Sequence, residues 1–118
     1  MNKNTSTYIK IKLQVGNNLN IGPGKIALLE SIVLNGSISS AAKSMGMSYR
    51  KAWKLVKEIN NASLNKIITT NTGGKGIRGT KISQEGIKFI KAFRNIEHKV
   101  FKEAEKEKEN LYKIFIKK

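Results

Sequence analysis

Residues 38–59 constrain the fold of this chain more than any other segment, because two short amphipathic helical patterns there are separated by a very tight turn. Ala42, in the first pattern, is small enough to let a crossing helix approach closely. Gly46 suits the left-handed backbone conformation that reverses the chain. Ser48 can accept a hydrogen bond from the free N–H groups of the next helix. The spacing predicts a helix-turn-helix, although a helical hairpin that binds nothing would share the pattern.

The second helix of this segment has one apolar and one cationic face. Three apolar residues at helical spacing predict its buried stripe: Ala52, Val56 and Ile59. The other face carries candidate DNA contacts: Ser48, Tyr49, Arg50, Lys51, Lys54 and Lys57. The N-terminal end of such a helix enters the major groove, where Arg50 or Lys51 could pair with guanine. The lysines further along suit the phosphate backbone, and the alternative for each is a solvated surface residue. Ser39 is the predicted N-cap of the preceding helix and a further candidate contact.

Residues 67–82 predict two short strands around a glycine-rich, cationic loop, 71–79. Such a ribbon resembles the wing of a winged helix, with three cations placed along the phosphates or in the minor groove: Lys75, Arg78 and Lys81. A nucleotide-binding loop is the competing interpretation. It is disfavoured because the glycines do not match G-x-x-x-x-G-K-[ST] and precede a strand instead of a helix.

The remaining segments complete the prediction of a single α+β, mainly α, winged helix-turn-helix domain over residues 1–118. Alternation from Tyr8 to Val15, followed by a turn, predicts an N-terminal β-hairpin over 8–21 with Val15 on its inner face. Three helices are expected within 24–61.

The predicted last helix, 83–118, carries an apolar stripe at steps of three and four residues: Ile87, Ile90, Phe93, Ile96, Val100 and Phe101. So long a terminal helix exceeds what a small core can cover, so we expect a dimer interface through this stripe. The alternative is that the stripe belongs to the core. The charged residues 103–110 interrupt the stripe, and there the end of the helix could detach.

The charge of the chain favours a polyanionic partner. Lys and Arg number 23 against 8 acidic residues, a formal net charge of +15, and residues 1–82 hold 13 basic and only 2 acidic side chains. A field of this sign attracts nucleic acid. Compositional drift towards lysine is the alternative, but the excess lies where the motifs lie.

The composition also argues against an enzyme and against a metal or other cofactor. The chain has no cysteine, no aspartate and one histidine, His98, so metal cages, carboxylate dyads and Ser-His-Asp triads are hard to assemble. No apolar run approaches the roughly 20 residues that span a bilayer, and the N-terminus lacks the apolar stretch of a signal peptide. We therefore expect a cytoplasmic protein without a membrane partner.

Several short motifs together resemble the N-terminal DNA-binding domain of the ModE-type molybdate-responsive regulators, which are related to LysR-type regulators. They occur in this order: 36–39 (GSIS), 41–42 (AA), 47–53 (MSYRKAW) and 73–76 (GGKG). Over about residues 8–100, the resemblance implies a dimeric winged helix-turn-helix that binds a palindromic operator. It also implies that Ser48, Tyr49, Arg50 and Lys51 lie on the recognition helix and Lys75 in the wing.

Two departures from the family pattern matter. Ile77 and Arg78 interrupt the glycine run usual in the wing. The chain also looks like the standalone form, without the C-terminal oxyanion-binding domains, so molybdate sensing is not transferred. A separate effector or partner protein would then supply any signal.

The predicted function is sequence-specific binding of double-stranded DNA by a homodimeric transcriptional regulator. A non-specific architectural protein of the nucleoid would share the charge but prefer no site. A winged-helix module that binds an acidic protein would bind its partner without DNA.

Overall fold

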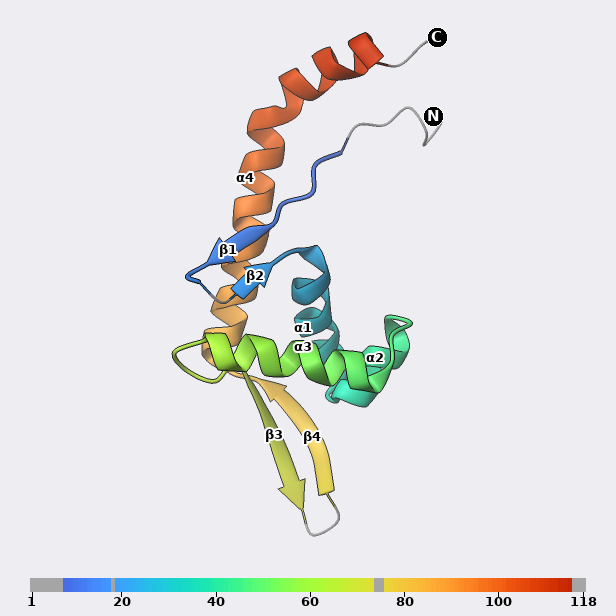
Figure 1. Cartoon of the computed structure of the whole chain (residues 1–118), viewed down its shortest axis with the longest axis vertical. Coiled ribbons are helices and arrows are strands. Elements are labelled where there is room, and N and C mark those ends of the chain that lie inside the picture. The colour runs from blue at the N-terminus through green and yellow to red at the C-terminus, as the bar shows by residue number, and fades with distance from the viewer. Residues whose placement is uncertain (1–7, 18, 74–75, 116–118) are drawn as a thin grey trace.

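A computed structural model describes residues 8–17, 19–73 and 76–115. The elements follow one another as β1 (Leu13–Val15), β2 (Leu19–Ile21), α1 (Pro23–Asn35), α2 (Ile38–Ser44), α3 (Tyr49–Ala62), β3 (Ile68–Gly73), β4 (Gly76–Ile82) and α4 (Gln84–Phe115). β1 pairs with β2 and β3 with β4, both antiparallel (Figure 1). This arrangement confirms the predicted mainly helical α+β winged helix-turn-helix.

The N-terminal hairpin is shorter than predicted. β1 and β2 pair only from Leu13 opposite Ile21 to Val15 opposite Leu19, because the chain turns into α1 directly after β2 and leaves residues 8–12 without a partner strand. Leu19 and Ile21 are buried in the core. The prediction that Val15 faces inward is wrong: its side chain is 49% exposed, because β1 runs past the helices towards the hairpin turn.

The core lies between α1, α2, α3 and the first half of α4. Its largest fully buried side chains include Ile21, Ile26, Leu28, Leu29, Ile32, Val56, Ile59, Ile68 and Phe93. Gly36 ends α1 at φ 74°, and its N–H donates to the Ile32 carbonyl at 2.8 Å. A left-handed residue at this place lets α2 start almost at once.

Caps and a tight turn define the helix-turn-helix. Gly46 has φ 66° and Ser48 Oγ accepts from the Lys51 N–H at 3.1 Å, as predicted. The predicted cap of α2 is wrong by two residues. Ser37, not Ser39, has the extended backbone of an N-cap, and its Oγ accepts from the Ser40 N–H at 3.0 Å. Ser39 lies within the first turn of α2 because the helix begins at Ile38.

The wing contains more strand than predicted. Pairing runs from Ile68 opposite Ile82 to Gly73 opposite Gly76, with one irregularity at Asn71/Thr72, so most of the expected loop 71–79 belongs to β3 and β4. Both strands contain several β-branched threonine and isoleucine residues, which favour extended backbone.

α4 is one helix of 32 residues, and its charged stretch 103–110 stays helical. Ser83 caps it by accepting the Gly86 N–H at 3.1 Å. The predicted stripe divides in two: Ile90 and Phe93 are buried, whereas Ile96 and Val100 remain 39% and 40% exposed. Among the described residues, no helix is long and apolar enough to cross a membrane.

An ion-pair cluster joins α1 to α4. Arg94 of α4 makes two hydrogen bonds to the Glu30 carboxylate of α1, at 2.6 and 3.1 Å, and a third to Glu97 at 2.6 Å. Hydrogen bonding to Glu30 and then to Glu97 raises the pKa of the Arg94 guanidinium. Glu97 is only 8% exposed, so this carboxylate occupies a place in the apolar stripe that the sequence pattern did not indicate.

Candidate nucleic-acid interface

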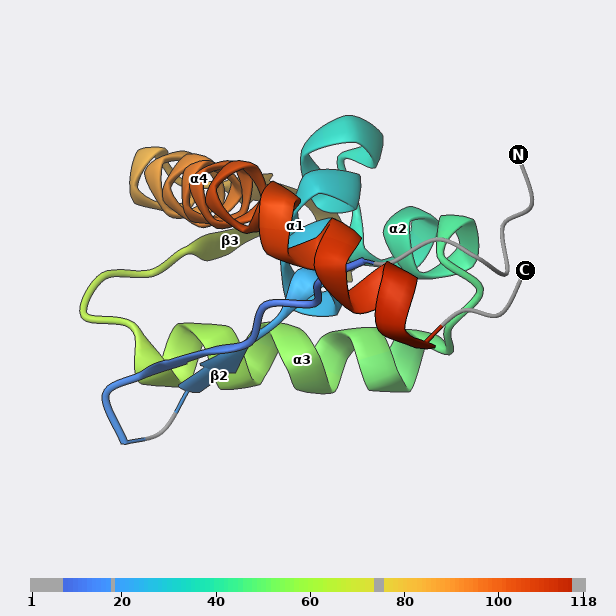
Figure 2. The same cartoon turned by 90° about the horizontal axis from the view of Figure 1, so that it is seen from above.

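α3 lies along one edge of the molecule, with its predicted apolar stripe in the core (Figure 2). Ala52, Val56 and Ile59 are all at most 2% exposed, which turns the opposite side of the helix to solvent. The predicted contact residues, at the N-terminal end of α3 and along its solvent side, are all exposed: Ser48, Tyr49, Arg50, Lys51, Lys54 and Lys57. The fold therefore exposes all six predicted residues on α3 and its N-cap, and we call this set the α3 face.

The α3 face is electrostatically positive. Residues 49–57 contain four cations and no acidic residue. The only acidic residue of α3, Glu58, lies 3.5 Å from the Lys25 ammonium of α1, which compensates its charge. The N-terminal end of the helix adds the positive pole of its dipole, so this end favours an anion such as phosphate.

Lys57 of the α3 face contacts Trp53, which lies beside the face. The Trp53 ring is half-buried and packs against the core. The Lys57 ammonium lies 5.9 Å from the centroid of this ring, within the range of a cation–π contact. Trp53 thus packs against the core and also contacts a cation of the α3 face.

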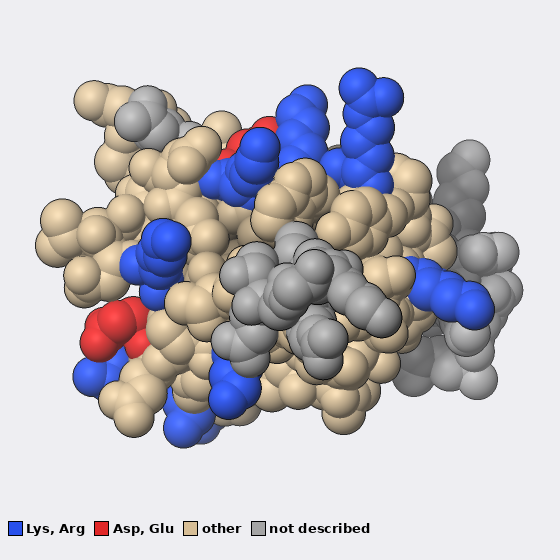
Figure 3. All heavy atoms as spheres, turned by 90° about the horizontal axis from the view of Figure 1, so that it is seen from below, with Lys and Arg blue, Asp and Glu red and all other residues tan. Residues whose placement is uncertain are grey.

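The wing projects from the body of the molecule near the C-terminal end of α3 (Figure 1). Seen from below, Lys and Arg side chains line the edge formed by α3 and surround the wing, and few acidic side chains interrupt them (Figure 3). Lys81 is exposed on β4. Lys75 and the side chain of Arg78 lie outside the described residues. Ser39 is exposed on the first turn of α2, apart from the α3 face.

Sequence reasoning missed one residue that connects α3 to the wing. Asn60, in the last turn of α3, makes three hydrogen bonds to the backbone of Ile67 and Ile68, at 2.9 to 3.0 Å. An asparagine near the end of a helix, shortly before a strand, is a weak signal by itself because such residues commonly cap or end helices.

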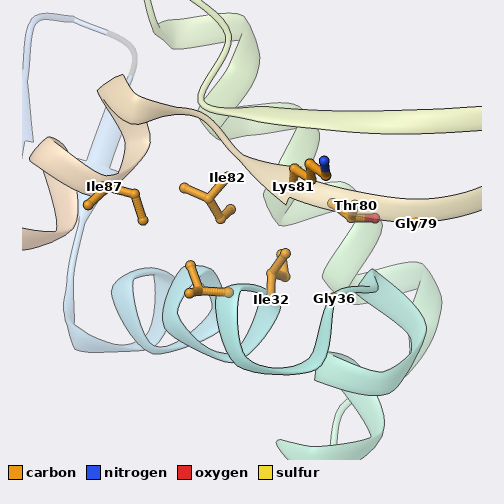
Figure 4. A pocket seen from close by; sticks show the side chains of 8 residues that line it. Ile32, Gly36, Gly79, Thr80, Lys81, Ile82 and Ile87 are labelled. Atoms are coloured by element: carbon orange, nitrogen blue, oxygen red, sulfur yellow. The ribbon is translucent and has the colours of Figure 1, made fainter.

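A crevice of about 360 Å³ separates α1 from β4 and the start of α4. Figure 4 shows Ile32, Ile82 and Ile87 turned towards it, while the Lys81 ammonium points to the side of β4 away from α1. The Thr80 hydroxyl is buried here without a hydrogen-bond partner among the described residues. The crevice is mostly apolar, and none of the residues that line it belongs to α3. Within residues 8–17, 19–73 and 76–115, no three His, Asp or Glu side chains are grouped to hold a metal ion.

Comparison with known proteins finds relatives whose names refer to ModE or to molybdenum. The chain is 36% identical over 85 residues to the DNA-binding transcriptional dual regulator ModE of Escherichia coli (strain K12), covering 72% of this chain and 32% of that protein. It is 39% identical over 82 residues to the molybdenum-pterin-binding protein MopB of Rhodobacter capsulatus, covering 70% and 30%. It is 36% identical over 73 residues to the molybdenum transport protein ModE of Herbaspirillum seropedicae, covering 62% and 27%.

These similarities confirm the predicted resemblance to the ModE-type regulators. The chain spans about a third of the length of these curated relatives. No protein-family model matches the chain.

Proposed function

Because this chain is homologous to ModE-type regulators over most of its length, we propose that it binds double-stranded DNA at preferred sequences and regulates transcription. The observation that carries the proposal is the α3 face. Its four cations and the positive pole of the helix point outwards from one edge, and no acidic residue lies among them. That combination suits a helix that lies in the major groove against two rows of phosphates.

The residues of the α3 face would divide their roles by position. Arg50 and Lys51, in the first turn, are placed to contact base edges, and arginine pairs with guanine through two hydrogen bonds. Ser48 and Tyr49 would contact phosphate or a base beside them. The lysines one and two turns further along the helix, Lys54 and Lys57, would contact the backbone and contribute affinity without sequence preference. The wing, through Lys75, Arg78 and Lys81, would lie on the adjacent backbone.

The protein would act as a homodimer. Ile90 and Phe93 are buried within the protomer, so of the predicted stripe, Ile96 and Val100 offer the most exposed apolar surface for a second copy. Ile87 and Phe101, which are half-buried, lie at its margins. A two-fold dimer would place its half-sites about one helical turn, ~34 Å, or a multiple of it, apart.

Selection of bound sequences from a random duplex pool tests this proposal. At about 150 mM salt, purely electrostatic binding is suppressed. We expect an enriched inverted repeat. A flat pool despite tight binding would favour the architectural alternative, and no retained DNA would leave only the protein-binding alternative.

Two variants separate base contacts from phosphate contacts. Arg50→Ala should reduce discrimination between the selected site and random DNA by roughly 1–3 kcal/mol. Lys54→Ala should weaken binding to both DNAs equally and lower the salt slope by about one. Equal losses on both DNAs for Arg50→Ala would refute its base-reading role.

A further inference from the structure

The side-chain amide of Asn60 pairs with β3 as a neighbouring strand would. Its Oδ1 accepts from the Ile67 and Ile68 N–H groups, each at 3.0 Å, and its Nδ2 donates to the Ile68 carbonyl at 2.9 Å. Both backbone groups of Ile68 are therefore satisfied by one side chain. Because all three bonds are made by one planar amide, the base of β3 cannot rotate about its axis without losing at least one of them.

These bonds use the edge of β3 that faces away from β4 and towards α3. In an antiparallel pair, residues alternate between those that bond to the partner strand and those whose backbone groups point outwards. Ile68 faces Ile82 across the ribbon, and Thr80, two residues before Ile82, faces Thr70. The backbone groups of Ile68 point towards α3, while the Thr80 N–H on the other edge donates to the Gly36 carbonyl at 2.9 Å.

Each edge of the wing is therefore attached to a different part of the helix-turn-helix. Asn60 attaches β3 to the C-terminal turn of α3, and Gly36 attaches β4 to the corner between α1 and α2. The apolar crevice of about 360 Å³ beside β4 means that packing alone does not hold this edge against α1. Three hydrogen bonds on the β3 edge and one on the β4 edge thus set the direction of a two-stranded ribbon.

We propose that Asn60 is a positioning residue that aims the wing at DNA flanking the site contacted by α3. The inference rests on the proposed DNA binding. Asn60 lies in the last turn of α3 and is partly buried, and its Oδ1 and one of its two amide N–H groups are bonded to the base of the wing, so we assign it no contact with DNA. Asn60 holds the wing in a fixed orientation relative to α3. The wing and α3 can then contact DNA together, without the entropy cost of ordering the wing on binding.

A duplex-truncation experiment tests this role. Wild-type protein, Asn60→Ala, Asn60→Asp and the control Asn61→Ala are titrated with a long duplex that carries the selected site with about 10 flanking base pairs on each side, and with a short duplex without these flanks. Asn61 is the exposed neighbour of Asn60 on the same helix. Thermal unfolding of each protein without DNA fixes a titration temperature at which all are folded.

For the wild type and Asn61→Ala, we expect truncation to weaken binding about tenfold, because the phosphate contacts of the wing are lost. Asn60→Ala should bind the long duplex about tenfold more weakly than wild type but the short duplex within about twofold of it. Asn60→Asp keeps the two accepted bonds but sets a carboxylate oxygen against the Ile68 carbonyl, and its negative charge weakens binding to both duplexes. Its loss should therefore be larger on the long duplex than on the short one.

Different results separate the two proposals. If Asn60→Ala loses the same factor on both duplexes, or loses nothing on the long duplex, the positioning role is wrong. If Asn60→Ala is unfolded, Asn60→Asp decides by the same comparison, and an equal loss on both duplexes refutes the inference. If the wild type binds neither duplex, the proposed DNA binding fails before Asn60 is tested.

Discussion

Replacing Gly86 with alanine tests how closely the start of α4 packs against the base of the wing. An added Cβ would lie 2.5 Å from Ile82 Cγ2, 2.9 Å from the Ile67 carbonyl oxygen and 3.0 Å from Ile67 Cγ2. The methyl groups can move by rotamer changes. The carbonyl oxygen cannot move freely, because it accepts the Ser83 N–H hydrogen bond at 2.9 Å. The first turn of α4 must therefore shift away from β3.

The expected change in the free energy of unfolding is the balance of a stabilising and a destabilising effect. Alanine stabilises a helix relative to glycine by up to about 1 kcal/mol. Forcing a methyl group into a filled site costs about 1–3 kcal/mol, and a lengthened hydrogen bond adds up to about 1 kcal/mol. We expect Gly86→Ala to lower the free energy of unfolding by about 2 kcal/mol, and Tm by about 8 °C.

Gly24→Ala is the matched control. Gly24 lies in the first turn of α1, and an added Cβ there would meet no atom within 4 Å. The same substitution should raise the free energy of unfolding by about 0.5–1 kcal/mol. Urea unfolding of both variants and the wild type, at one protein concentration because association shifts apparent stability, gives the comparison. A Gly86→Ala protein as stable as Gly24→Ala would refute the packing argument.

Three further predictions concern stability and are measured by the same urea unfolding. Thr80→Val should raise the free energy of unfolding by about 1 kcal/mol, because it removes a buried hydroxyl that lacks a partner among the described residues; a loss would indicate that the hydroxyl is hydrogen-bonded. Ser37→Ala should lower stability by about 1 kcal/mol, whereas Ser39→Ala should change it by less than about 0.5 kcal/mol; the reverse order would restore Ser39 as the cap. Arg94→Met should cost about 1–2 kcal/mol, because it leaves the buried Glu97 carboxylate without its cation; adding Glu97→Gln should recover part of this loss, and no recovery would contradict the explanation.

The helix-turn-helix could be predicted from the sequence because its signals act over a few residues. Gly46 can adopt the left-handed conformation of the turn because it has no side chain. Two residues later, Ser48 caps the start of the next helix. Periodicity likewise identified the buried stripe of α3, and by exclusion its cationic face. The sequence did not identify the N-cap of α2, because Ser37 and Ser39 are both serines near the start of this helix. Only the backbone conformation shows that Ser37 is the extended residue before the helix.

The extent of the wing was underestimated for a related reason. Glycines between 71 and 79 indicated a loop, but strand pairing depends on the partner strand as well as on the residue itself. Once Ile68 is paired with Ile82, the pairing continues, with one register shift at Asn71/Thr72, to Gly73 and Gly76.

Contacts between elements were decided only by the tertiary structure. The apolar pattern of α4 is the same at Phe93 and Ile96, yet one is 2% and the other 39% exposed, because the buried side of the helix continues from Phe93 to Glu97 and leaves Ile96 beside it. The bonds of Asn60 depend on the direction in which the chain returns from α3 into β3, which no periodicity encodes. Sequence alone determined which helix presents cations. How the wing is held relative to that helix required the packed structure, because it rests on single hydrogen bonds between segments that meet only after folding.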